Sequence, residues 1–559
     1  MHRRMHTRRN GWKHAVSASA AVLLTALVAA CGGSGSSGAG SSGSGLTLTV
    51  ATTAGPLARN FNPFLPTSVA LTDNVVSFIY EPLVQFNPFK PQTPTPWLAT
   101  SWNWSDGQKT LTFNLRKEVK WSDGTPFTSA DVAFTFNLIK KYPGANTNGV
   151  TFSSVEATDP YTVTFHFDNP SFSQFYFLAG NTYIVPQHIW STVGDPMKYT
   201  DPDPVGTGPY KLATFSTQGF LLSSNDSFWQ GKPAVTGLQF PSYDGNGPAN
   251  AAVESGQVDW AGQFIPNIKS IYLNKSPDNH TWSPATSQVA LVPNVSVAPL
   301  NQLPVRQAIS LALDRQTIAS VAESQQATAV QTQTGIIANE SEFIAPQYQG
   351  MNYTQDVAKA KSLLTQAGYT PGAGGIMQKN GKPLTLNIVD DAGFTDYMTA
   401  AQIIASQLKA IGINATVSGV SDNAWNDDLA SGKFQLSIDY SNNEGVDPFA
   451  IYNGWLNSTL IQNGSASGDF GRWIDPKTQS YINGYLNATS DAARQQAIDG
   501  LEGVMVNNLP VIPLFGGPDW TEYSTKRVTG WPTPSDPYQP GAPFAPNDEV
   551  VVLHLKPAK

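Results

Sequence analysis

Hydrophobic and polar residues form regular patterns in the first half of the chain. They alternate over 46–51, 111–115 and 161–167, and this period of two predicts three strands with one buried face each. After the second of these strands, Thr128 is suited to cap a helix, and Asp131 three residues later would face the positive end of the helix dipole. The strand and the capped helix contain no group of chemically reactive side chains, so they are interpreted as scaffold.

The second half of the chain switches between helical and strand patterns. Apolar residues recur every three or four positions over 305–313, which predicts a helix with one buried face, and a later helix is predicted to end at Gly368. A strand over 384–389, a helix over 397–411 and a strand over 413–417 then follow one another. This order and these lengths imply a right-handed parallel crossover, so the second half is predicted to be α/β.

The first 31 residues predict an export signal. Five basic residues precede an apolar run over 15–30, which is shorter than the roughly 20 apolar residues of a membrane span. The run ends in Val28-Ala29-Ala30-Cys31, which is similar to a bacterial lipobox, and Cys31 is the single cysteine of the chain. We therefore interpret residues 1–30 as a lipoprotein signal peptide and Cys31 as the lipidated first residue of the mature protein. Because Arg8-Arg9 resembles the pair of a twin-arginine signal, the Sec and Tat export routes both remain open.

Glycine, serine and alanine alone make up residues 32–45, which predicts a flexible tether with a span of about 20 Å. Loss of residues 1–30 would remove five basic and no acidic side chains, leaving 28 basic and 41 acidic side chains and a net charge of −13. An acidic protein has no general attraction for nucleic acid or for anionic lipid. We therefore expect no nucleic-acid partner, and contact with the membrane through the lipid anchor.

No pattern in the sequence indicates a catalytic or metal site. The histidines of the mature chain are isolated from one another, and there is no GxSxG motif. With one cysteine, the chain has no internal disulfide and no thiolate zinc site. The adjacent carboxylates Asp390-Asp391 and Asp427-Asp428 are expected to be solvated. We predict no enzyme activity, no cofactor and no metal, with a secreted hydrolase as the remote alternative, which a search for cleavage products would identify.

Three further features are interpreted as structural. His188 is expected to pack with one ring nitrogen satisfied. The stretch Gly206-Thr207-Gly208-Pro209 lacks the spacing and the lysine of a phosphate-binding loop, so its glycines are expected to allow a tight turn with positive φ. Arg306 and Arg315 are expected on the polar side of their helix, in surface or interdomain ion pairs.

Several stretches resemble one protein family. Residues 97–140 contain LATSW, TFNLR and VKWSDGTPFTSADVAFT in this order, and YEPLV, IVPQHIW, GTGPY and VRQAISLALDR occur elsewhere. These motifs are similar to those of the family 5 solute-binding proteins of bacterial ABC importers, which include the oligopeptide and dipeptide receptors. The resemblance runs from about Leu46 to Arg527, nearly the whole mature chain.

This resemblance implies an α/β, two-lobed periplasmic-binding-protein-like fold of type II, in the large cluster with an extra inserted subdomain. The chain would cross between the lobes twice, so two strands would form the hinge. The expected divisions are a signal peptide (1–30), a tether (31–45), the core of lobe I (46–79, 202–293 and 520–559), an inserted subdomain of lobe I (80–201) and lobe II (294–519).

The resemblance also implies a lipid-anchored substrate-binding protein. The two lobes would trap a solute in the crevice between them, and contacts made by both lobes would favour the closed form. The closed form would deliver the solute to the membrane permease subunits of an ABC importer, whose separate ATPase supplies the energy. The protein is expected to be a monomer outside the cytoplasm, anchored to the cell membrane at the cell surface or in the periplasm.

In the peptide receptors of this family, an acidic residue shortly before an Asp-Pro or Glu-Pro pair holds the peptide's α-amino group. Asp447-Pro448 matches that pair. An ungapped count places Glu444 at the acidic position, whereas a gap would place Asp439-Tyr440 there. The neighbouring tryptophan of the family is replaced by Ser441, which is a departure from the peptide pattern.

Other ligand-binding residues follow from the same resemblance. Trp425 resembles the tryptophan that lines the family's pocket, and Asn62 belongs to a turn similar to an early loop near the cleft. Asn442, Asn443 and Glu444, together with Trp425 and Trp455, would also suit a sugar, whose C–H faces stack on aromatic rings. The expected ligand is an oligopeptide, with an oligosaccharide as the alternative.

Overall fold

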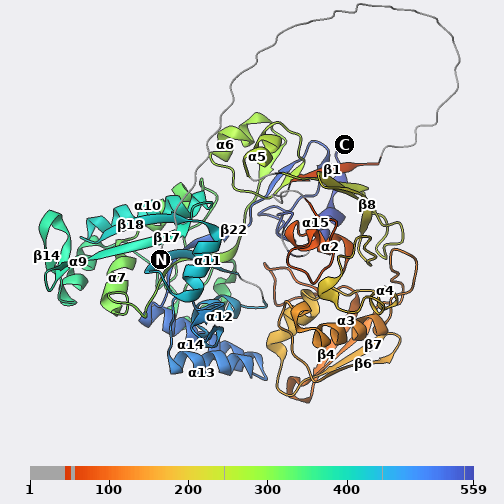
Figure 1. Ribbon diagram of the computed structural model, residues 1–559, viewed down its shortest axis with the longest axis horizontal. Coiled ribbons are helices and arrows are strands. Elements are labelled where there is room, and N and C mark those ends of the chain that lie inside the picture. The colour runs from red at the N-terminus through yellow and green to blue at the C-terminus, as the bar shows by residue number, and fades with distance from the viewer. Residues whose placement is uncertain (1–44, 52–56, 244–245, 443–444, 545, 547) are drawn as a thin grey trace, which may run out of the picture. The chain divides into compact units, whose positions relative to one another are not determined.

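The computed structural model describes residues 45–559 apart from 52–56, 244–245, 443–444, 545 and 547 (Figure 1). The predicted signal peptide, Cys31 and most of the predicted tether lie outside the described residues, as does Glu444. Within the part that is described, no helix has the length and apolar character needed to cross a membrane.

A seven-stranded sheet, here called the first sheet, combines strands from distant parts of the chain. β1 pairs in parallel with β10 and β11, and β23, more than 200 residues further on, pairs antiparallel with β11 and β12. The strands in spatial order are β12 (Asn279–Thr281), β23 (Glu522–Ser524), β11 (Trp260–Ala261), β1 (Thr47–Ala51), β10 (Gly237–Pro241), β9 (Gly219–Ser224) and β8 (Tyr210–Ser216).

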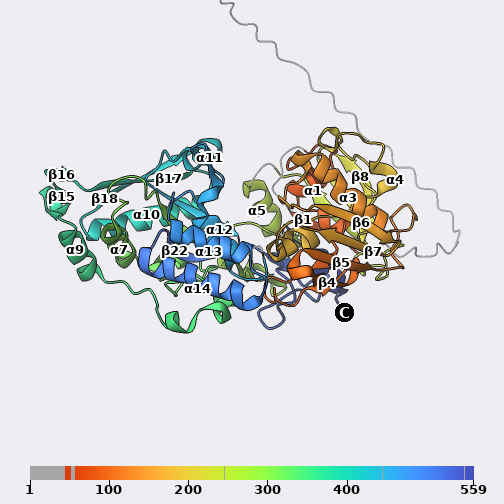
Figure 2. The same ribbon diagram turned by 90° about the horizontal axis from the view of Figure 1, so that it is seen from below.

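A four-stranded antiparallel sheet and helix α3 (Ser129–Lys141) form a separate layer pair inserted between β1 and β8 (Figure 2). The strand order is β4 (Ala99–Ser105), β5 (Thr110–Leu115), β7 (Thr162–His166) and β6 (Ser154–Asp159). The predicted cap of α3 is confirmed, because Thr128 and Asp131 form a reciprocal capping box.

A five-stranded mixed sheet, here called the second sheet, organises the second half of the chain. Its order is β18 (Asn414–Val420), β17 (Thr385–Asp391), β19 (Leu436–Asn442), β13 (Ala285–Pro293) and β22 (Ile512–Pro518). Alternate residues of β13 enter two different cores: Val289 and Leu291 join one cluster, and Ala290 and Val292 join the other. The sheet is therefore covered on both faces, as an α/β architecture requires.

The helices of the second half divide between these two cores. The core containing Leu291 includes α7 (Leu303–Ala312), α8 (Arg315–Ala322), α9 (Val357–Gln366) and α10 (Thr395–Ala410). The other core includes α11 (Asp422–Ser431), α12 (Phe449–Leu456), α13 (Pro476–Leu486) and α14 (Asp491–Asn508). The predicted strand, helix and strand are confirmed as β17, α10 and β18, and β17 pairs with β18 in parallel.

The remaining elements are short. The other helices are α1 (Val69–Thr72), α2 (Val76–Ile79), α4 (Gln187–Trp190), α5 (Asn246–Glu254), α6 (Ile268–Ile271) and α15 (Glu549–His554). The small sheets are β2 (Val84–Gln85) with β3 (Thr95–Pro96), β14 (Thr370–Pro371) with β15 (Met377–Lys379) and β16 (Lys382–Pro383), β20 (Ile461–Gln462) with β21 (Ser465–Ala466), and β24 (Val528–Thr529) with β25 (Lys556–Pro557).

The chain passes between the first and second sheets twice, and the two crossings are hydrogen-bonded to each other. One crossing joins β12 to β13, and the other joins β22 to β23. The backbone N–H of Asp519 donates to the Pro284 carbonyl at 2.8 Å, and the Thr281 hydroxyl donates to the Thr521 carbonyl at 2.8 Å. The two crossings thus form one paired ribbon.

Two expectations about charged residues are wrong. Arg306 and Arg315 are buried rather than on a polar surface, and they donate to backbone carbonyls: Arg306 to Leu509 at 3.0 Å and Arg315 to Pro513 at 2.6 Å. Backbone carbonyls at the end of α14 and on β22 thereby satisfy guanidinium groups that lack a carboxylate. The Asp390-Asp391 pair is also buried, since Asp390 accepts the backbone N–H of Ile438 across the second sheet at 3.0 Å.

The Gly206–Gly208 turn needs glycine for a different reason from the one predicted. Neither glycine has a positive φ. A Cβ at Gly208 would lie 2.5 Å from the Phe78 carbonyl oxygen, and the Gly208 N–H donates to the Ile79 carbonyl at 2.9 Å. Close packing against the end of α2 therefore excludes a side chain. His188 bonds Asp123 through one ring nitrogen at 2.8 Å, as expected, but its side chain is 35% exposed and is not packed in a core.

Candidate functional site

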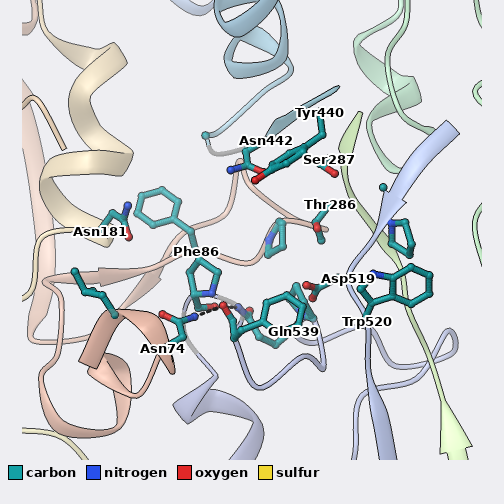
Figure 3. Close-up of a pocket in the computed structure, with 18 of the residues that line it drawn as sticks. Asn74, Phe86, Asn181, Thr286, Ser287, Tyr440, Asn442, Asp519, Trp520 and Gln539 are labelled. Atoms are coloured by element: carbon teal, nitrogen blue, oxygen red, sulfur yellow. Dashed lines mark hydrogen bonds between the residues drawn. The ribbon is translucent and has the colours of Figure 1, made fainter. Parts of the chain in front are cut away.

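A pocket of about 570 Å³ lies beside the paired crossings (Figure 3). Thr286 and Ser287 at the start of β13 and Asp519 just after β22 belong to its wall, so the crossings themselves contribute to the site. Phe86 and Asn181 line it from the segments around the inserted sheet. The labelled side chains in Figure 3 are Asn74, Phe86, Asn181, Thr286, Ser287, Tyr440, Asn442, Asp519, Trp520 and Gln539.

A second pocket of about 450 Å³ adjoins the first. The two pockets share Tyr176, Asn442 and Gly445 in their walls. The second pocket is otherwise lined mainly by the segment around Phe172–Phe177 and by the residues from Val446 into α12. Because these residues line both pockets, the two pockets are neighbours along one part of the molecule.

The end of β19 explains how Tyr440 reaches the first pocket. Side chains alternate between the two faces of a strand, so Tyr440 and Asn442 share one face and Asp439 and Ser441 the other. Tyr440 is 46% exposed and lines the pocket, whereas Asp439 is buried and does not line either pocket. Burial raises the pKa of Asp439 to about 7. Of these two candidates, the structure therefore places only Tyr440 at the pocket.

Asp447 lies at the second pocket but serves the local structure. Its carboxylate accepts the Tyr485 hydroxyl at 2.8 Å and the backbone N–H of Phe449 at 3.0 Å, which fixes the start of α12. Burial raises the pKa of Asp447 to about 6, and the Tyr485 hydrogen bond opposes this rise. The Tyr485 ring stacks on Phe449 with centroids 3.6 Å apart, so this corner of the second pocket is firmly packed.

Three predicted ligand-binding residues lie away from both pockets. The Trp425 indole N–H donates to the Ser437 hydroxyl at 2.9 Å, and the Trp455 indole N–H donates to the Gln288 amide oxygen at 2.8 Å. Both rings are buried in the core that contains Val292. Asn62 is also buried, and its amide donates to the Pro196 carbonyl at 2.8 Å, so it orders a turn.

Three carboxyl groups in the first pocket were missed by the sequence reasoning. Glu323 follows α8, Asp396 lies in the first turn of α10, and Asp519 follows β22. They come from three separate segments, so no local motif marks them. The only sequence signal was positional: Asp519 lies at the boundary where the chain was expected to cross between lobes.

Burial dominates the electrostatics of these carboxyl groups. It raises the pKa of Glu323 well above its ordinary value, and the nearby charge of Asp396 adds to this effect. Burial likewise raises the pKa of Asp396 and brings that of Asp519 to about 7. Among the described residues, no Lys, Arg or His lines either pocket. The pocket thus contains acids with no basic partner in its wall.

The fold is that of an α/β protein, and the pockets beside the paired crossings are its candidate binding site. The sequence profile of a family described as "Bacterial extracellular solute-binding proteins, family 5 Middle" matches residues 93–463. Because the match covers more than half of the chain, the protein belongs to this family, as the sequence motifs had indicated. Binding of solutes for ABC importers is the role of this family, and the chain is a binding protein rather than an enzyme.

Curated relatives and solved structures agree with this assignment. The probable ABC transporter periplasmic-binding protein SapA of Escherichia coli (strain K12) is 24% identical over 480 residues, covering 82% of this chain and 85% of SapA. The glutathione-binding protein GsiB of Salmonella choleraesuis (strain SC-B67) is 28% identical over 407 residues, covering 71% of this chain and 73% of GsiB.

A crystal structure of an oligopeptide ABC transporter, periplasmic oligopeptide-binding protein from Thermotoga maritima matches with a TM-score of 0.84 and 25% identity over 92% of this chain and 99% of that chain. A mannohexaose-bound structure of a protein with the same description and source matches with a TM-score of 0.76, 25% identity and the same coverage. The predicted α/β, two-lobed fold of type II is confirmed.

Proposed function

We propose that this protein is a lipid-anchored receptor that captures an extracellular oligopeptide and delivers it to an ABC import permease. One observation carries the proposal: the first pocket combines Phe86 and Asn181, from the segments around the inserted sheet, with Tyr440 and Asn442 of the second sheet. A solute in this pocket would contact both groups of residues at once. Such contacts stabilise the conformation in which the two groups are close, so binding would favour closure.

We infer that the paired crossings act as the hinge of this closure. Gly516 on β22 approaches β13 so closely that a Cβ at this position would lie 2.5 Å from the Ala285 Cβ. The hydrogen bonds between the crossings would keep them together while backbone dihedrals near 282–284 and 519–521 change. A permease would then recognise the closed form.

We propose the same division into lobes as the sequence indicated. Pairing of β23 with β11 and β12 supports placing residues 520–559 with 46–79 and 202–293 in lobe I. Contact of the Trp531 ring with Trp260, at 5.5 Å between centroids, supports it further. Residues 80–201 would form the inserted subdomain, and 294–519 would form lobe II.

An oligosaccharide remains the alternative ligand, and two observations favour it. A structurally similar protein has been solved with mannohexaose bound. The second pocket is lined by neutral polar side chains, including Asn148, Gln174 and Asn453, which suit hydroxyl groups. The two neighbouring pockets would accommodate either polymer.

We further propose that Cys31 carries the lipid and that residues 32–45 form a flexible tether. The apolar run before Cys31 and the acidic charge of the mature chain support attachment through lipid rather than through a basic surface. The protein would work as a monomer on the outer side of the cell membrane, facing its permease.

Calorimetry with purified mature protein tests the proposed function. The titrants are a defined set of synthetic tri- to nonapeptides and mannohexaose. Binding of peptides with a dissociation constant in the micromolar range or below, weakened in Tyr440→Ala and unchanged in the exposed variant Asp427→Asn, would support the peptide receptor. Binding of mannohexaose alone would select the oligosaccharide alternative. Absence of binding by every titrant would reject both ligand classes.

A further inference from the structure

We propose that the first pocket receives a positively charged side chain of the solute, held by the carboxyl groups of Glu323, Asp396 and Asp519, so that basic peptides are the preferred substrates. The proposal rests on the proposed function as a peptide receptor and goes beyond it. The family resemblance implies that an acid shortly before Asp447-Pro448 holds the peptide's α-amino group, so these three carboxyl groups would bind a second positive charge.

Glu323 and Asp519 are buried acids in the pocket wall, and neither has a basic partner among the described residues. Glu323 is fully buried, and neither of its carboxyl oxygens has a hydrogen-bond partner among the described residues. Asp519 is 6% exposed, and its Oδ2 atom also lacks such a partner. Neither residue, nor Asp396, forms an ion pair with a described Lys, Arg or His. Unpaired buried carboxyl groups are costly, which indicates that a ligand supplies the missing partner.

The rest of the wall favours a cation over an anion. Because no described basic residue lines the pocket, a carboxylate of the solute would face acids and find no partner. The rings of Tyr397, Tyr440 and Trp520 line the same space, and aromatic faces attract ammonium and guanidinium groups. Figure 3 shows Trp520 beside Asp519, with Tyr440 on the far side of the pocket.

A metal ion fits the site less well than an organic cation. Within the described residues, no group of three or more His, Cys, Asp and Glu side chains is placed to hold a metal ion. Glu323, Asp396 and Asp519 therefore do not form a compact coordination site for a metal ion. They line one space of about 570 Å³, which is large enough for the end of a lysine or arginine side chain.

The proposal implies proton release on binding. The empty pocket favours protonated acids because burial raises the pKa of each of the three carboxyl groups, that of Asp519 to about 7. Tyr397 interacts electrostatically with both Asp396 and Glu323, and Asp390 interacts with Asp396. Tyr176 and Tyr440 also line the pocket. A cation stabilises the ionised acids, so affinity should rise with pH through about 7, by at most about tenfold per pH unit for each proton released.

Matched peptides test the charge requirement on the wild-type mature protein, stripped of co-purified ligand by unfolding and refolding. The probes are pentapeptides with free termini and one central residue: lysine, Nε-dimethyl-lysine, Nε-acetyl-lysine or glutamate. Dimethylation enlarges the side chain and keeps its charge, whereas acetylation enlarges it and removes the charge. We expect lysine and dimethyl-lysine peptides to bind at least tenfold more tightly than the acetyl-lysine peptide, with the glutamate peptide weakest.

Glu323→Gln and Asp519→Asn should each reduce the ratio of lysine to acetyl-lysine affinity, and Asp427→Asn on the exposed side of α11 should not. If either variant fails to fold, the wild-type comparison still decides. Equal affinity for the lysine and acetyl-lysine peptides would overturn the inference while leaving the peptide receptor intact. A loss of affinity that occurs only when the peptide's α-amino group is acetylated would also overturn the inference. Binding of mannohexaose and of no peptide would reject the peptide receptor and this inference together.

Discussion

The guanidinium carbon of Arg494 lies 3.7 Å from the ring centroid of Phe172. Arg494 belongs to α14, whereas Phe172 belongs to the segment after the inserted sheet and lines the second pocket. The Arg494 side chain is only 8% exposed, and it also pairs with Asp491. This contact therefore joins α14 to the segment that lines the second pocket.

Replacement of the Phe172 ring should weaken solute binding. Phe172→Leu removes the aromatic face, and a partly desolvated cation–π contact contributes roughly 0.5–2 kcal/mol. We expect a loss of affinity of this size in calorimetry with the tightest-binding peptide. Phe172→Tyr keeps the ring and should bind as the wild type does. Wild-type affinity in Phe172→Leu would show that the contact does not contribute to the bound form.

Glu444→Gln should reduce solute affinity if the acid contacts the ligand, as the family pattern implies. For a peptide, the lost partner of a buried ammonium would cost roughly 2–5 kcal/mol of binding. For a sugar, the weakened hydrogen bond would cost roughly 1–3 kcal/mol. Asp439→Asn is the comparison, because Asp439 is buried on the opposite face of β19 and should leave affinity unchanged. The reverse result, with loss only in Asp439→Asn, would transfer the role to Asp439.

Trp455→Phe should affect stability and leave solute affinity unchanged. The substitution leaves the amide oxygen of buried Gln288 without its indole donor, which costs about 1–3 kcal/mol of the free energy of unfolding. Urea unfolding and calorimetry measure the two effects. Trp520 lines the first pocket, so Trp520→Phe should reduce solute affinity and leave the free energy of unfolding nearly unchanged. A clear loss of affinity in Trp455→Phe would restore it as a ligand-binding residue.

Asp469→Asn should make stability less sensitive to pH. Asp469 is buried, and desolvation raises its pKa to about 8, whereas an exposed aspartate has a pKa of about 3.9. The folded state therefore holds a proton that the unfolded state releases, so this contribution to stability is present below about pH 4 and is lost as pH rises towards 8. The amide oxygen of asparagine can still accept the backbone N–H of Trp473.

Urea unfolding between pH 5 and pH 8 measures this effect. The wild type should lose more stability over this range than Asp469→Asn, by at least about 1 kcal/mol. The exposed variant Asp427→Asn should follow the wild type. Parallel pH profiles for wild type and Asp469→Asn would contradict the assignment of a raised pKa to Asp469.

Cys31→Ser should release the protein from the membrane. Without a thiol at this position no lipid can be attached, so the protein should be found in the medium or the periplasm. Cell fractionation and immunoblotting measure its location, and calorimetry on the released protein should give wild-type solute affinity. A Cys31→Ser protein that stays with the membrane fraction would show that the anchor lies elsewhere.

Local patterns were sufficient to predict individual elements of this protein. Residues close in sequence produce the apolar periods of β17, α10 and β18 and the cap of α3. Such local interactions do not depend on where the segment lies in the fold. The family motifs allowed the fold class to be predicted as well. They could not place Trp455, because a tryptophan suits a core and a sugar-binding surface equally until its neighbours are known.

The amino-acid sequence by itself determined the secondary structure of the main elements, the acidic charge and the family of this protein, since these depend on short-range patterns and composition. Only the tertiary structure decided which side chains meet at the pocket. Glu323, Asp396 and Asp519 come from three segments brought together by strand pairing around the crossings. It also decided that Arg306 and Arg315 are buried, because their partners are backbone carbonyls, which every residue carries and no sequence pattern can distinguish.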